Sequence, residues 1–572
     1  MDDIKLLYNL WRENAVRDGD LIKELIEKES DTEQISDMFY RSLEFGTAGL
    51  RGIIGAGTNR MNVYTVGQAT QGLADFLNSE YDNPTVAIAY DSRIKSELFA
   101  KEAAGVLAAN GIYVYFFPEL VPTPMLSYSV RTLGCSSGII ITASHNPAEY
   151  NGFKCYDKNG YQMTDKSAKK TYDFISQVDL FKDIKRTDFD DGLADDMIDF
   201  IEQWLFDGFY EAVLSKRVNI NAAKESDIKV IYTPLNGTGN KPVQKVLKSM
   251  GIKELKVVES QKKPDGNFPT CPYPNPEIRQ SFEEAFKTAE TFKADLIIAT
   301  DPDCDRVGIA VLDDGEYKLM TGNELGVMLI EYLLSEMIEN GTLPNDAIVI
   351  KSIVSTPLID AIVNNYNANL VDLLTGFKYV GEYITSLEEK DEEHRFVFAM
   401  EESYGYLSGT HARDKDAVVA SMLICEMAAF YKSKGISLYD FMNSIYKKYG
   451  YYISRLDNYA FKGAIGMEKM SEIMSKLRKT PIKEIGKTKI TIIKDYKTGD
   501  VINCKTNEKT TTGLPPSNIL QYILDSGDTV IVRPSGTEPK LKVYITSKSS
   551  DKESSEKKAK AISVSVKDLL AI

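Results

Sequence analysis

The chain contains 572 residues, too many for one hydrophobic core, and this length indicates about four domains. Hydrophobic residues at 43% and charged residues at 26% are the balance of an ordinary water-soluble globular protein. The net charge of −15 argues against nucleic acids and anionic membranes as partners. A small anionic substrate remains open, because a local group of arginines and backbone N–H groups can bind it.

Three features of the sequence predict a cytoplasmic protein. The opening segment MDDIKLLYNLWREN indicates an amphipathic helix, not a secretory signal. No apolar run approaches the roughly 20 residues that cross a bilayer. The six cysteines lie far apart with no C-x-x-C pair, which argues against a zinc site or disulfides and fits a reducing compartment. No obligate protein partner is indicated.

One pattern occurs three times: an apolar strand, a helix, and a second apolar strand that ends in a polar loop. The copies span residues 85–147, 228–306 and 347–406. Strands that are apolar on both faces and alternate with helices predict parallel or mixed sheets covered by helices. Ligands bind at the carboxyl ends of such strands, so we expect each copy to contribute its loop to one central cleft.

The predicted fold class is therefore α/β, with three similar α/β domains that have mixed sheets, and a C-terminal α+β domain, around the cleft. The last domain is indicated by strand-like segments such as KITIIKDY and DTVIVRPSG beside the helix-like MEKMSEIMSKLRK. We expect an N-terminal helical segment and four domains, with the boundaries 1–40, 41–205, 206–320, 321–448 and 449–572.

The loop TASHNP places Ser144 between a strand end and an Asn-Pro turn. Such a serine can cap a helix or fill a turn, or its hydroxyl can meet a substrate. The loop lacks the G-x-S-x-G elbow of hydrolases, and the chain has only three histidines to act as a base. The loop therefore argues against acyl transfer and leaves a phosphoryl-carrying serine open.

The loop TDPDCDR carries Asp301, Asp303 and Asp305 directly after an apolar strand, with Arg306 next in the chain. Three acids at alternate positions repel one another unless a cation lies among them, and oxygen ligands suit a hard ion such as Mg²⁺. An EF-hand is excluded because Arg306 and Leu312 stand where Gly and Glu are required. A solvated acidic turn is the alternative, but it explains the preceding apolar strand poorly.

Two further loops carry binding chemistry. The segment MEESYGY offers carboxylates and a serine that can bind sugar hydroxyls, or else acids in the first turn of a helix. The segment RPSGTEPK offers Arg533, two hydroxyls and backbone N–H groups around Gly536, which suit a phosphate or form a plain turn. The sequence has neither a Walker loop nor a G-x-G-x-x-G motif, so ATP and NAD are not indicated.

Taken in order, TASHNP, TDPDCDR, EESYG and RPSGTEPK resemble the signature loops of the α-D-phosphohexomutases, with one loop per domain. Further segments, among them FGTAGLRG, AYDSR, YTPLNGTG and TGFKYVGE, extend the resemblance from Phe45 to Lys540. With the stretch EESYGYLSGTHARDKDA, they are most similar to the bacterial phosphoglucomutases related to the phosphopentomutase-like branch.

The resemblance implies an isomerase, an intramolecular phosphotransferase that interconverts α-glucose 1-phosphate and glucose 6-phosphate. The implied reaction runs through a phosphoserine enzyme and a sugar 1,6-bisphosphate. It implies one Mg²⁺ per active site, with glucose 1,6-bisphosphate as activator and intermediate. Pentose and mannose phosphates stay open as alternative substrates of the same mechanism.

The resemblance also implies roles residue by residue. The expected phosphoserine is Ser144, and the expected Mg²⁺ ligands are this residue with Asp301, Asp303 and Asp305. We group Lys154, Arg51 and His145 with Ser144 as catalytic. The implied substrate-binding residues are Arg306, Lys351, Lys378, Glu401 and Ser403, and the implied phosphate-binding residues are Arg533, Ser535, Gly536 and Thr537.

The chain departs from the family pattern at three positions. Asn236 replaces a common His, Ala399 replaces a common Gly, and Cys304 replaces a smaller residue. None of these changes removes a ligand, but the first two leave the substrate preference open.

Two other functions fit parts of the sequence. In a haloacid-dehalogenase-type enzyme, Asp301 would be the nucleophile and Asp303 the acid, but TASHNP and RPSGTEPK would then have no role. A non-catalytic sugar-phosphate-binding protein would not need Ser144 and the three aspartates intact. Ser144→Ala should abolish transfer in a phosphoserine enzyme and spare it in a haloacid-dehalogenase-type enzyme. Absence of phosphate on Ser144 under every condition would favour the binding protein.

Overall fold

The computed structural model describes residues 2–46, 49–461, 463–480, 482–535 and 540–571. The chain divides into two compact units. The larger unit comprises residues 1–325, 377–399 and 403–437, and the smaller unit comprises 326–376, 400–402 and 438–572. The chain crosses between them several times, so neither unit is one continuous stretch of sequence.

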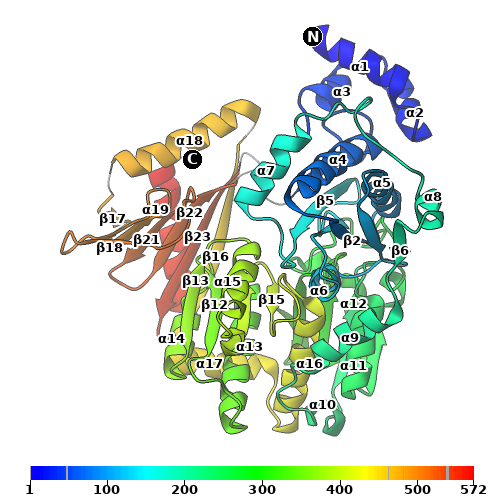
Figure 1. The fold of residues 1–572 in the computed structure, drawn as a ribbon. Coiled ribbons are helices and arrows are strands. Elements are labelled where there is room, and N and C mark those ends of the chain that lie inside the picture. The colour runs from blue at the N-terminus through cyan, green and yellow to red at the C-terminus, as the bar shows by residue number, and fades with distance from the viewer. Residues whose placement is uncertain (1, 47–48, 462, 481, 536–539, 572) are drawn as a thin grey trace. The chain divides into compact units, whose positions relative to one another are not determined.

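Three helices open the larger unit: α1 (Asp2–Asn14), α2 (Gly19–Glu27) and α3 (Thr32–Phe39), blue in Figure 1. Asp18 and Asp31 precede α2 and α3, and each carboxylate accepts a hydrogen bond from a backbone N–H of the first turn. These caps satisfy donors that the helices themselves leave unpaired.

A mixed six-stranded sheet with the order β1-β5-β4-β2-β3-β6 follows. β2 pairs in parallel with β3 and β4, β3 pairs in parallel with β6, and β5 pairs antiparallel with β4 and β1. The strands are β1 (Leu50–Ile53), β2 (Thr85–Tyr90), β3 (Tyr113–Phe116), β4 (Ser137–Ile141), β5 (Tyr150–Asp157) and β6 (Ile198–Phe200). The helices of this part are α4 (Val63–Glu80), α5 (Ser96–Ala109), α6 (Thr123–Thr132), α7 (Asp165–Ile175) and α8 (Phe189–Ala194).

A second mixed sheet of the larger unit has the order β11-β10-β9-β7-β8, in which β7 is parallel to β8 and β9 while β10 is antiparallel to β9 and β11. Its strands are β7 (Lys229–Thr233), β8 (Glu254–Val257), β9 (Leu296–Thr300), β10 (Val307–Asp313) and β11 (Glu316–Met320). The other elements here are α9 (Gln203–Leu214), α10 (Ala222–Glu225), α11 (Asn240–Met250), α12 (Glu283–Phe292), α15 (Lys378–Glu388), β15 (Gly405–Leu407), α16 (Ala417–Ser433) and the 3₁₀ turns η1 (Glu259–Gln261), η2 (Arg279–Phe282) and η3 (Glu393–Arg395).

The smaller unit begins with a parallel pair of strands, β12 (Ile348–Ser352) and β13 (Asn369–Leu373). Helices α14 (Leu358–Asn365) and α17 (Leu438–Tyr449) belong to this unit, and α13 (Gly322–Glu339) enters it. Strand β14 (Phe396–Glu401) runs from the larger unit into the smaller one. All these strands are predominantly apolar, as the sequence pattern predicts.

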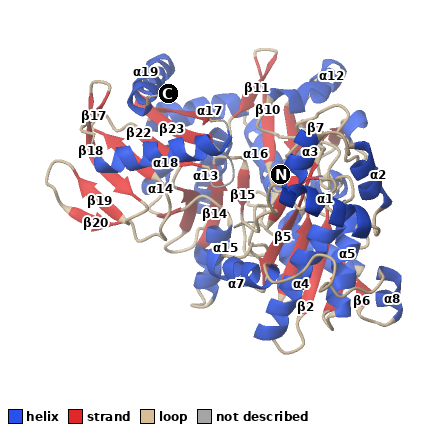
Figure 2. Cartoon of the chain, turned by 90° about the horizontal axis from the view of Figure 1, so that it is seen from above, coloured by secondary structure: helices blue, strands red, loops and turns tan. Residues whose placement is uncertain are grey.

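An antiparallel sheet with the order β16-β23-β22-β21-β18-β19-β20 dominates the rest of the smaller unit (Figure 2). Residues of α18 and α19 join strand residues in one buried core, so both helices pack on this sheet. The elements are β16 (Tyr451–Ala460), α18 (Gly463–Lys479), β17 (Glu484–Ile485), β18 (Thr488–Asp495), β19 (Asp500–Asn503), β20 (Lys509–Thr511), β21 (Leu520–Leu524), β22 (Thr529–Pro534), β23 (Lys540–Ser549) and α19 (Lys552–Leu570).

The apolar runs that the sequence pattern assigns to strands coincide with β2, β4, β7, β9, β12 and β14. Each of the three repeated patterns therefore forms strands whose polar loop follows the carboxyl end. Within the described residues, every helix is too short or too polar to span a membrane.

The side chain of Trp11 on α1 is fully buried, with ring contacts to Phe39, Tyr64 and Phe181. Trp11→Ala should therefore destabilise the larger unit by about 3–5 kcal/mol through the cavity it leaves. Leu6→Ala, on the same helix but 66% exposed, should change stability by no more than about 0.5 kcal/mol. Denaturant unfolding followed by fluorescence and circular dichroism checks both variants. Equal effects would show that α1 does not anchor the unit.

Candidate active site

Ser144 lies in the turn between β4 and β5, with its backbone in the left-handed region at φ 52°. Its backbone N–H donates to Thr142 Oγ1 at 2.8 Å, which stabilises the turn. The side chain is buried, and its Oγ donates to Asp301 Oδ2 at 2.8 Å while lying 3.1 Å from His145 Nδ1. The hydroxyl is thus held between the serine loop and the aspartate loop.

The buried guanidinium of Arg93 holds the serine loop in this conformation. Its Nη atoms donate to four backbone carbonyls of the loop, which belong to Ser144, Asn146, Pro147 and Tyr150. Asp91 pairs with Arg93 on the other side, with 3.4 Å between Oδ2 and Nε. A left-handed backbone at a serine costs about 1–2 kcal/mol. The four hydrogen bonds from the rigid Arg93 guanidinium offset this strain.

Asp301, Asp303 and Asp305 lie on the turn between β9 and β10, and all three are fully buried or nearly so. One oxygen of each carboxylate lies within 4.8 Å of the others. Two like charges 4 Å apart repel by about 4 kcal/mol at an effective dielectric constant of 20. Burial and the two neighbouring carboxylates accordingly raise the pKa of Asp301 well above its usual range. The cluster requires positive charge close by.

Two buried lysines supply part of this charge. Lys154 Nζ, on β5, lies 2.8 Å from Asp303 Oδ2, and Lys415 Nζ lies 3.2 Å from Asp305 Oδ2. Burial opposes the ionisation of Asp303, but Lys154 outweighs it and lowers the pKa of this carboxyl below its usual range. Lys415 also pairs with Asp414 at 2.9 Å, so its ammonium bridges two carboxylates.

The aspartate cluster also fits a metal ion. Asp303 Oδ1 and Asp305 Oδ1 are buried and make no hydrogen bond to any described residue. Buried carboxylate oxygens without hydrogen bonds are costly, and a hard cation held by the three aspartates would offset this cost. The donor set consists of oxygens alone, which is the ligand type that Mg²⁺ prefers.

The scaffold fixes the aspartate loop from two directions. Thr123, at the start of α6, donates its N–H to the Asp303 carbonyl at 2.9 Å and its hydroxyl to Asp303 Oδ2 at 3.1 Å. Thr238 donates its N–H to the Pro302 carbonyl at 2.8 Å. A Cβ on Gly237 would lie 2.5 Å from Pro302 Cα, so the backbone approach there requires glycine.

Three other residues predicted for the site, His145, Arg51 and Arg306, also lie in the larger unit. His145 is held neutral, because burial and then Arg306 and Arg51 lower its pKa well below the usual range. Arg51 donates to the Asn146 side chain at 3.2 Å, and Arg306 donates to Glu277 at 3.0 Å.

Two more of the predicted substrate-binding residues, Ser403 and Lys378, lie in the larger unit. Next to Ser403, the Tyr404 carbonyl accepts the Val307 N–H at 3.1 Å, which places this segment beside the end of the aspartate loop. Lys378 instead pairs with Asp165 at the start of α7, at 2.6 Å.

The smaller unit holds the remaining predicted residues. Glu401 accepts the Gly376 N–H at 2.6 Å. Lys351 is buried between Asp372 and Asp360, at 2.9 and 3.4 Å, and these carboxylates outweigh burial and raise its pKa.

The described part of the loop that is predicted to bind phosphate also lies in the smaller unit. Arg533 is half-buried on β22, and the Ser535 N–H donates to the Lys540 carbonyl at 2.7 Å. Gly536 and Thr537, which were also predicted to bind phosphate, lie outside the described residues.

Four successive segments match the domains of one family, phosphoglucomutase/phosphomannomutase: domain I at residues 42–181, domain II at 207–315, domain III at 321–449 and the C-terminal domain at 486–561. A phosphoglucomutase from Staphylococcus aureus (strain bovine RF122 / ET3-1) is 36% identical over 550 residues, which cover 94% of this chain and 95% of that protein. The chain belongs to the phosphoglucomutase/phosphomannomutase family. The predicted family, fold class and enzyme class are thereby confirmed.

Other relatives agree. A Staphylococcus saprophyticus phosphoglucomutase is 34% identical and covers 94% of this chain and 96% of its own length. Two solved structures share the fold: a Paramecium phosphoglucomutase (TM-score 0.66, 16% identity, 93% and 95% of the two chains) and a Burkholderia thailandensis family protein (TM-score 0.65, 16% identity, 91% and 96%).

Sequence reasoning missed three residues that contact the aspartate and serine loops from other elements: Arg93, Thr123 and Lys415. Arg93 was visible in the motif AYDSR and Lys415 in ARDKDA, but neither motif indicates which carbonyl or carboxylate its cation would meet. Thr123 has no motif of its own, because its contact depends on how α6 packs against the aspartate loop.

Removing one carboxylate from the cluster should weaken metal binding. We expect Asp303→Asn and Asp305→Asn each to lower the affinity for Mn²⁺, used as a probe for Mg²⁺, by about 10–100-fold or more. Calorimetric titration of the metal-stripped chain measures this. Asp314→Asn, in an exposed turn where Asn also tolerates the left-handed backbone, should bind like the unchanged chain. Unchanged Mn²⁺ affinity in both Asp303→Asn and Asp305→Asn would show that the metal does not bind at the aspartate cluster.

Glu402 should make the stability of the smaller unit fall as pH rises. Burial, and then the neighbouring Glu401, raises the pKa of Glu402 to about 7, and its carboxyl accepts from Ser352 Oγ at 3.0 Å. Between about pH 4.5 and 7 the unfolded chain has lost this proton and the folded chain keeps it, so stability decreases by up to about 3 kcal/mol.

Glu402→Gln should remove this decrease, which thermal unfolding at pH 5 and pH 8 checks. Glu472→Gln, on the exposed face of α18, should keep the pH dependence of the unchanged chain. If Glu402→Gln and the unchanged chain lose the same stability between the two pH values, Glu402 is not the titrating group.

Proposed function

We propose that the chain is a phosphoglucomutase that interconverts α-glucose 1-phosphate and glucose 6-phosphate. Ser144 carries the phosphoryl group in this proposal, and glucose 1,6-bisphosphate is the intermediate and activator. The observation that carries the proposal is the 2.8 Å hydrogen bond from Ser144 Oγ to Asp301 Oδ2. A serine in contact with a cluster of buried carboxylates is suited to hold a phosphoryl group beside a metal ion, and the relatives at 36% and 34% identity are named phosphoglucomutases.

The chemistry needs a protein group that gives a phosphoryl group and recovers it, because no ATP site is indicated. A sugar hydroxyl attacks the phosphorus, the bond from phosphorus to Ser144 Oγ breaks, and the serine oxygen keeps the electron pair. Magnesium, when held by the three aspartates, would offset the negative charge of the transferring group. Lys154, Arg51 and His145 are the proposed groups that stabilise charge or move the proton of the attacking hydroxyl.

Reversing the sugar is the second requirement, because the bisphosphate must present its other phosphate to the serine. We assign the sugar hydroxyls to Glu401 and Ser403. A carboxylate only accepts hydrogen bonds, so it can serve different hydroxyl pairs in the two orientations. The distal phosphate is assigned to the loop that contains Arg533, Ser535, Gly536 and Thr537, and further phosphate or substrate contacts to Arg306, Lys351 and Lys378.

The proposal includes one Mg²⁺ per active site and a cytoplasmic location. Small sugar phosphates are the proposed partners, with no nucleic acid or membrane. Phosphomannomutase or phosphopentomutase activity is the alternative within the same mechanism. Glucose and mannose differ only in the configuration of one hydroxyl, and the Asn236 and Ala399 departures bear on the choice of sugar.

Ser144→Ala tests the proposed nucleophile. The variant should lose at least about 10⁴-fold in turnover of glucose 1-phosphate, measured with Mg²⁺ and catalytic glucose 1,6-bisphosphate, because no other group replaces the phosphoryl carrier. Intact-protein mass spectrometry of the unchanged chain should show one phosphoryl group that phosphatase removes, and Ser144→Ala should lack it. Cys504→Ser, at an exposed position far along the chain, is the matched control and should keep full activity.

Three results would overturn parts of this proposal. Turnover retained in Ser144→Ala would favour a haloacid-dehalogenase-type reaction at Asp301. A chain never phosphorylated at Ser144, and inactive with every sugar, would favour a binding protein. Fast turnover of ribose or mannose 1-phosphate beside negligible turnover of glucose 1-phosphate would change the substrate and keep the mechanism.

A further inference from the structure

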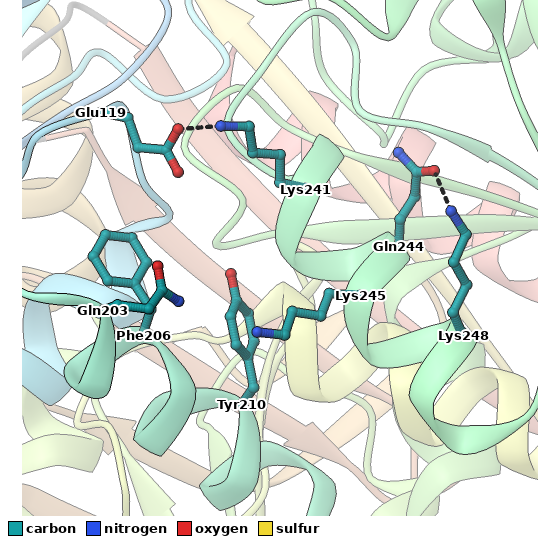
Figure 3. A pocket seen from close by; sticks show the side chains of 8 residues that line it. All are labelled: Glu119, Gln203, Phe206, Tyr210, Lys241, Gln244, Lys245 and Lys248. Atoms are coloured by element: carbon teal, nitrogen blue, oxygen red, sulfur yellow. Dashed lines mark hydrogen bonds and ion pairs between the residues drawn. The ribbon is translucent and has the colours of Figure 1, made fainter.

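A pocket outside the proposed active site lies in the larger unit, between α9, α11 and the connection from β3 to α6. It consists of two adjoining hollows, together called the α9–α11 pocket. The first hollow, of about 360 Å³, is the one in Figure 3. The second, of about 340 Å³, shares Glu119, Phe206, Tyr210 and Lys241 with the first and continues to Thr238. Each hollow has the volume of a small-ligand site.

Three lysines line the first hollow from one helix. Lys241, Lys245 and Lys248 follow one another on α11 at spacings of four and three residues, so they share a face of the helix. Figure 3 shows the Lys245 ammonium beside the Tyr210 ring, 4.3 Å from its centroid. Among the residues that line this hollow, Glu119 is the only carboxylate. The hollow therefore favours an anion.

The existing ion pairs of these lysines are weak enough for an anionic ligand to replace them. Lys241 pairs with Glu119 across the hollow, and Lys245 pairs with Asp207 at 2.8 Å, but the lysine side chains are 73% and 47% exposed. Exposed pairs of this kind contribute little stability, about 0–1 kcal/mol. An incoming phosphate can replace Glu119 beside Lys241 at small cost.

The second hollow reaches the start of α11, where the hydroxyl of Thr238 is a further hydrogen-bond donor. No side chain caps this helix, and Lys241 lies in its first turn, so the positive end of the helix dipole adds to the lysine charge. Thr238 is 2% exposed and lines the hollow, and its Oγ1 is buried with no hydrogen bond to any described residue. Buried hydroxyls nearly always have partners, which points to an atom supplied from outside the chain.

The rest of the second hollow suits a flat, partly polar body. Aromatic rings of Tyr90, Phe206 and Tyr210 line it together with proline and aliphatic side chains, and Glu97 and Glu119 provide acceptors for amino or hydroxyl groups. A plain sugar phosphate would leave much of this apolar wall unused. A purine or pyrimidine nucleoside matches it better, because the ring packs on apolar surface and the polar edge meets the acids.

We propose that the α9–α11 pocket binds a nucleoside phosphate, with the phosphate on Lys241 and Lys245 and the nucleoside in the second hollow. The site goes beyond the proposed mutase reaction, which has no use for a nucleotide. Gly237 and Thr238 of the motif YTPLNGTG, which also hold the aspartate loop, form part of the wall of this pocket.

The walls of this pocket also hold the aspartate loop, so occupancy should affect the metal site. Thr238 donates to the Pro302 carbonyl, and Thr123, which lies between the wall residues Val121 and Met125, is hydrogen bonded to Asp303. A ligand that fixes both walls would change the freedom of the loop between them. Because such coupling is reciprocal, nucleotide and metal should alter the affinity of each other by the same factor.

Calorimetric titration of the full chain with adenosine and uridine 5′-monophosphate tests the site directly, without a turnover assay. At least one nucleotide should bind saturably, and more tightly than inorganic phosphate. The double variant Lys241→Gln/Lys245→Gln should weaken nucleotide binding by at least about tenfold, because each lost charge-assisted hydrogen bond to the phosphate contributes strongly to the affinity. Thr238→Val should weaken it several-fold. Lys253→Gln, an exposed lysine just beyond α11, is the matched control and should bind like the unchanged chain.

Hydrogen exchange locates the binding. The nucleotide should slow amide exchange in residues 117–125 and 237–243, and repeating the titration with Mn²⁺ present should shift its affinity. The proposal is wrong if neither nucleotide binds up to millimolar concentration, or if the double lysine variant binds as tightly as the control. It is also wrong if Arg533→Gln abolishes nucleotide binding while the double lysine variant retains it, because the nucleotide then occupies the proposed sugar-phosphate site.

Discussion

Charge compensation within a buried cluster is the constraint on which the larger unit depends. Three carboxylates at the end of β9 are removed from water, and each would be unstable there alone. Lys154 and Lys415 reach them from β5 and from the segment before α16, which are more than 250 residues apart in sequence. The cluster thus ties distant parts of the chain together, and its carboxylates form a group that could hold a metal ion.

The serine loop is constrained in a complementary way, through the backbone. Ser144 adopts a conformation that few non-glycine residues accept, and within the loop Arg93 binds backbone carbonyls around it. One side chain of the loop also supports the turn, because Thr142 Oγ1 accepts the Ser144 N–H. Together the two loops place a buried hydroxyl in direct contact with a cluster of carboxylates.

Much of this could be predicted from the sequence, because strands and loops there carry strong local signals. Continuous apolar runs such as those of β4 and β9 mark buried strands, and the polar residues after them identify the loops. Ser144 and the three aspartates stand in such loops, so the sequence was enough to find them. The bridging role of Lys415 and the hydrogen bonds of Thr123 were not predictable, since each depends on packing between elements far apart in the chain. The burial of Lys351 between Asp360 and Asp372 was also missed, because it depends on the register in which β12 and β13 pair, which the sequence pattern does not give.

The aspartate loop also contains a sulfur atom, and its position bears on which donor atoms the loop offers. Cys304 has its backbone in the left-handed region at φ 52°, and its side chain is buried, with Sγ beside Gly239. Burial, followed by the nearby Asp301, raises the pKa of this thiol well above its usual range, so it stays protonated. The protonated thiol is a weaker nucleophile and a weaker ligand than the thiolate. The loop therefore offers its surroundings hard carboxylate oxygens, while its one soft donor is kept buried and protonated between two of the aspartates in sequence.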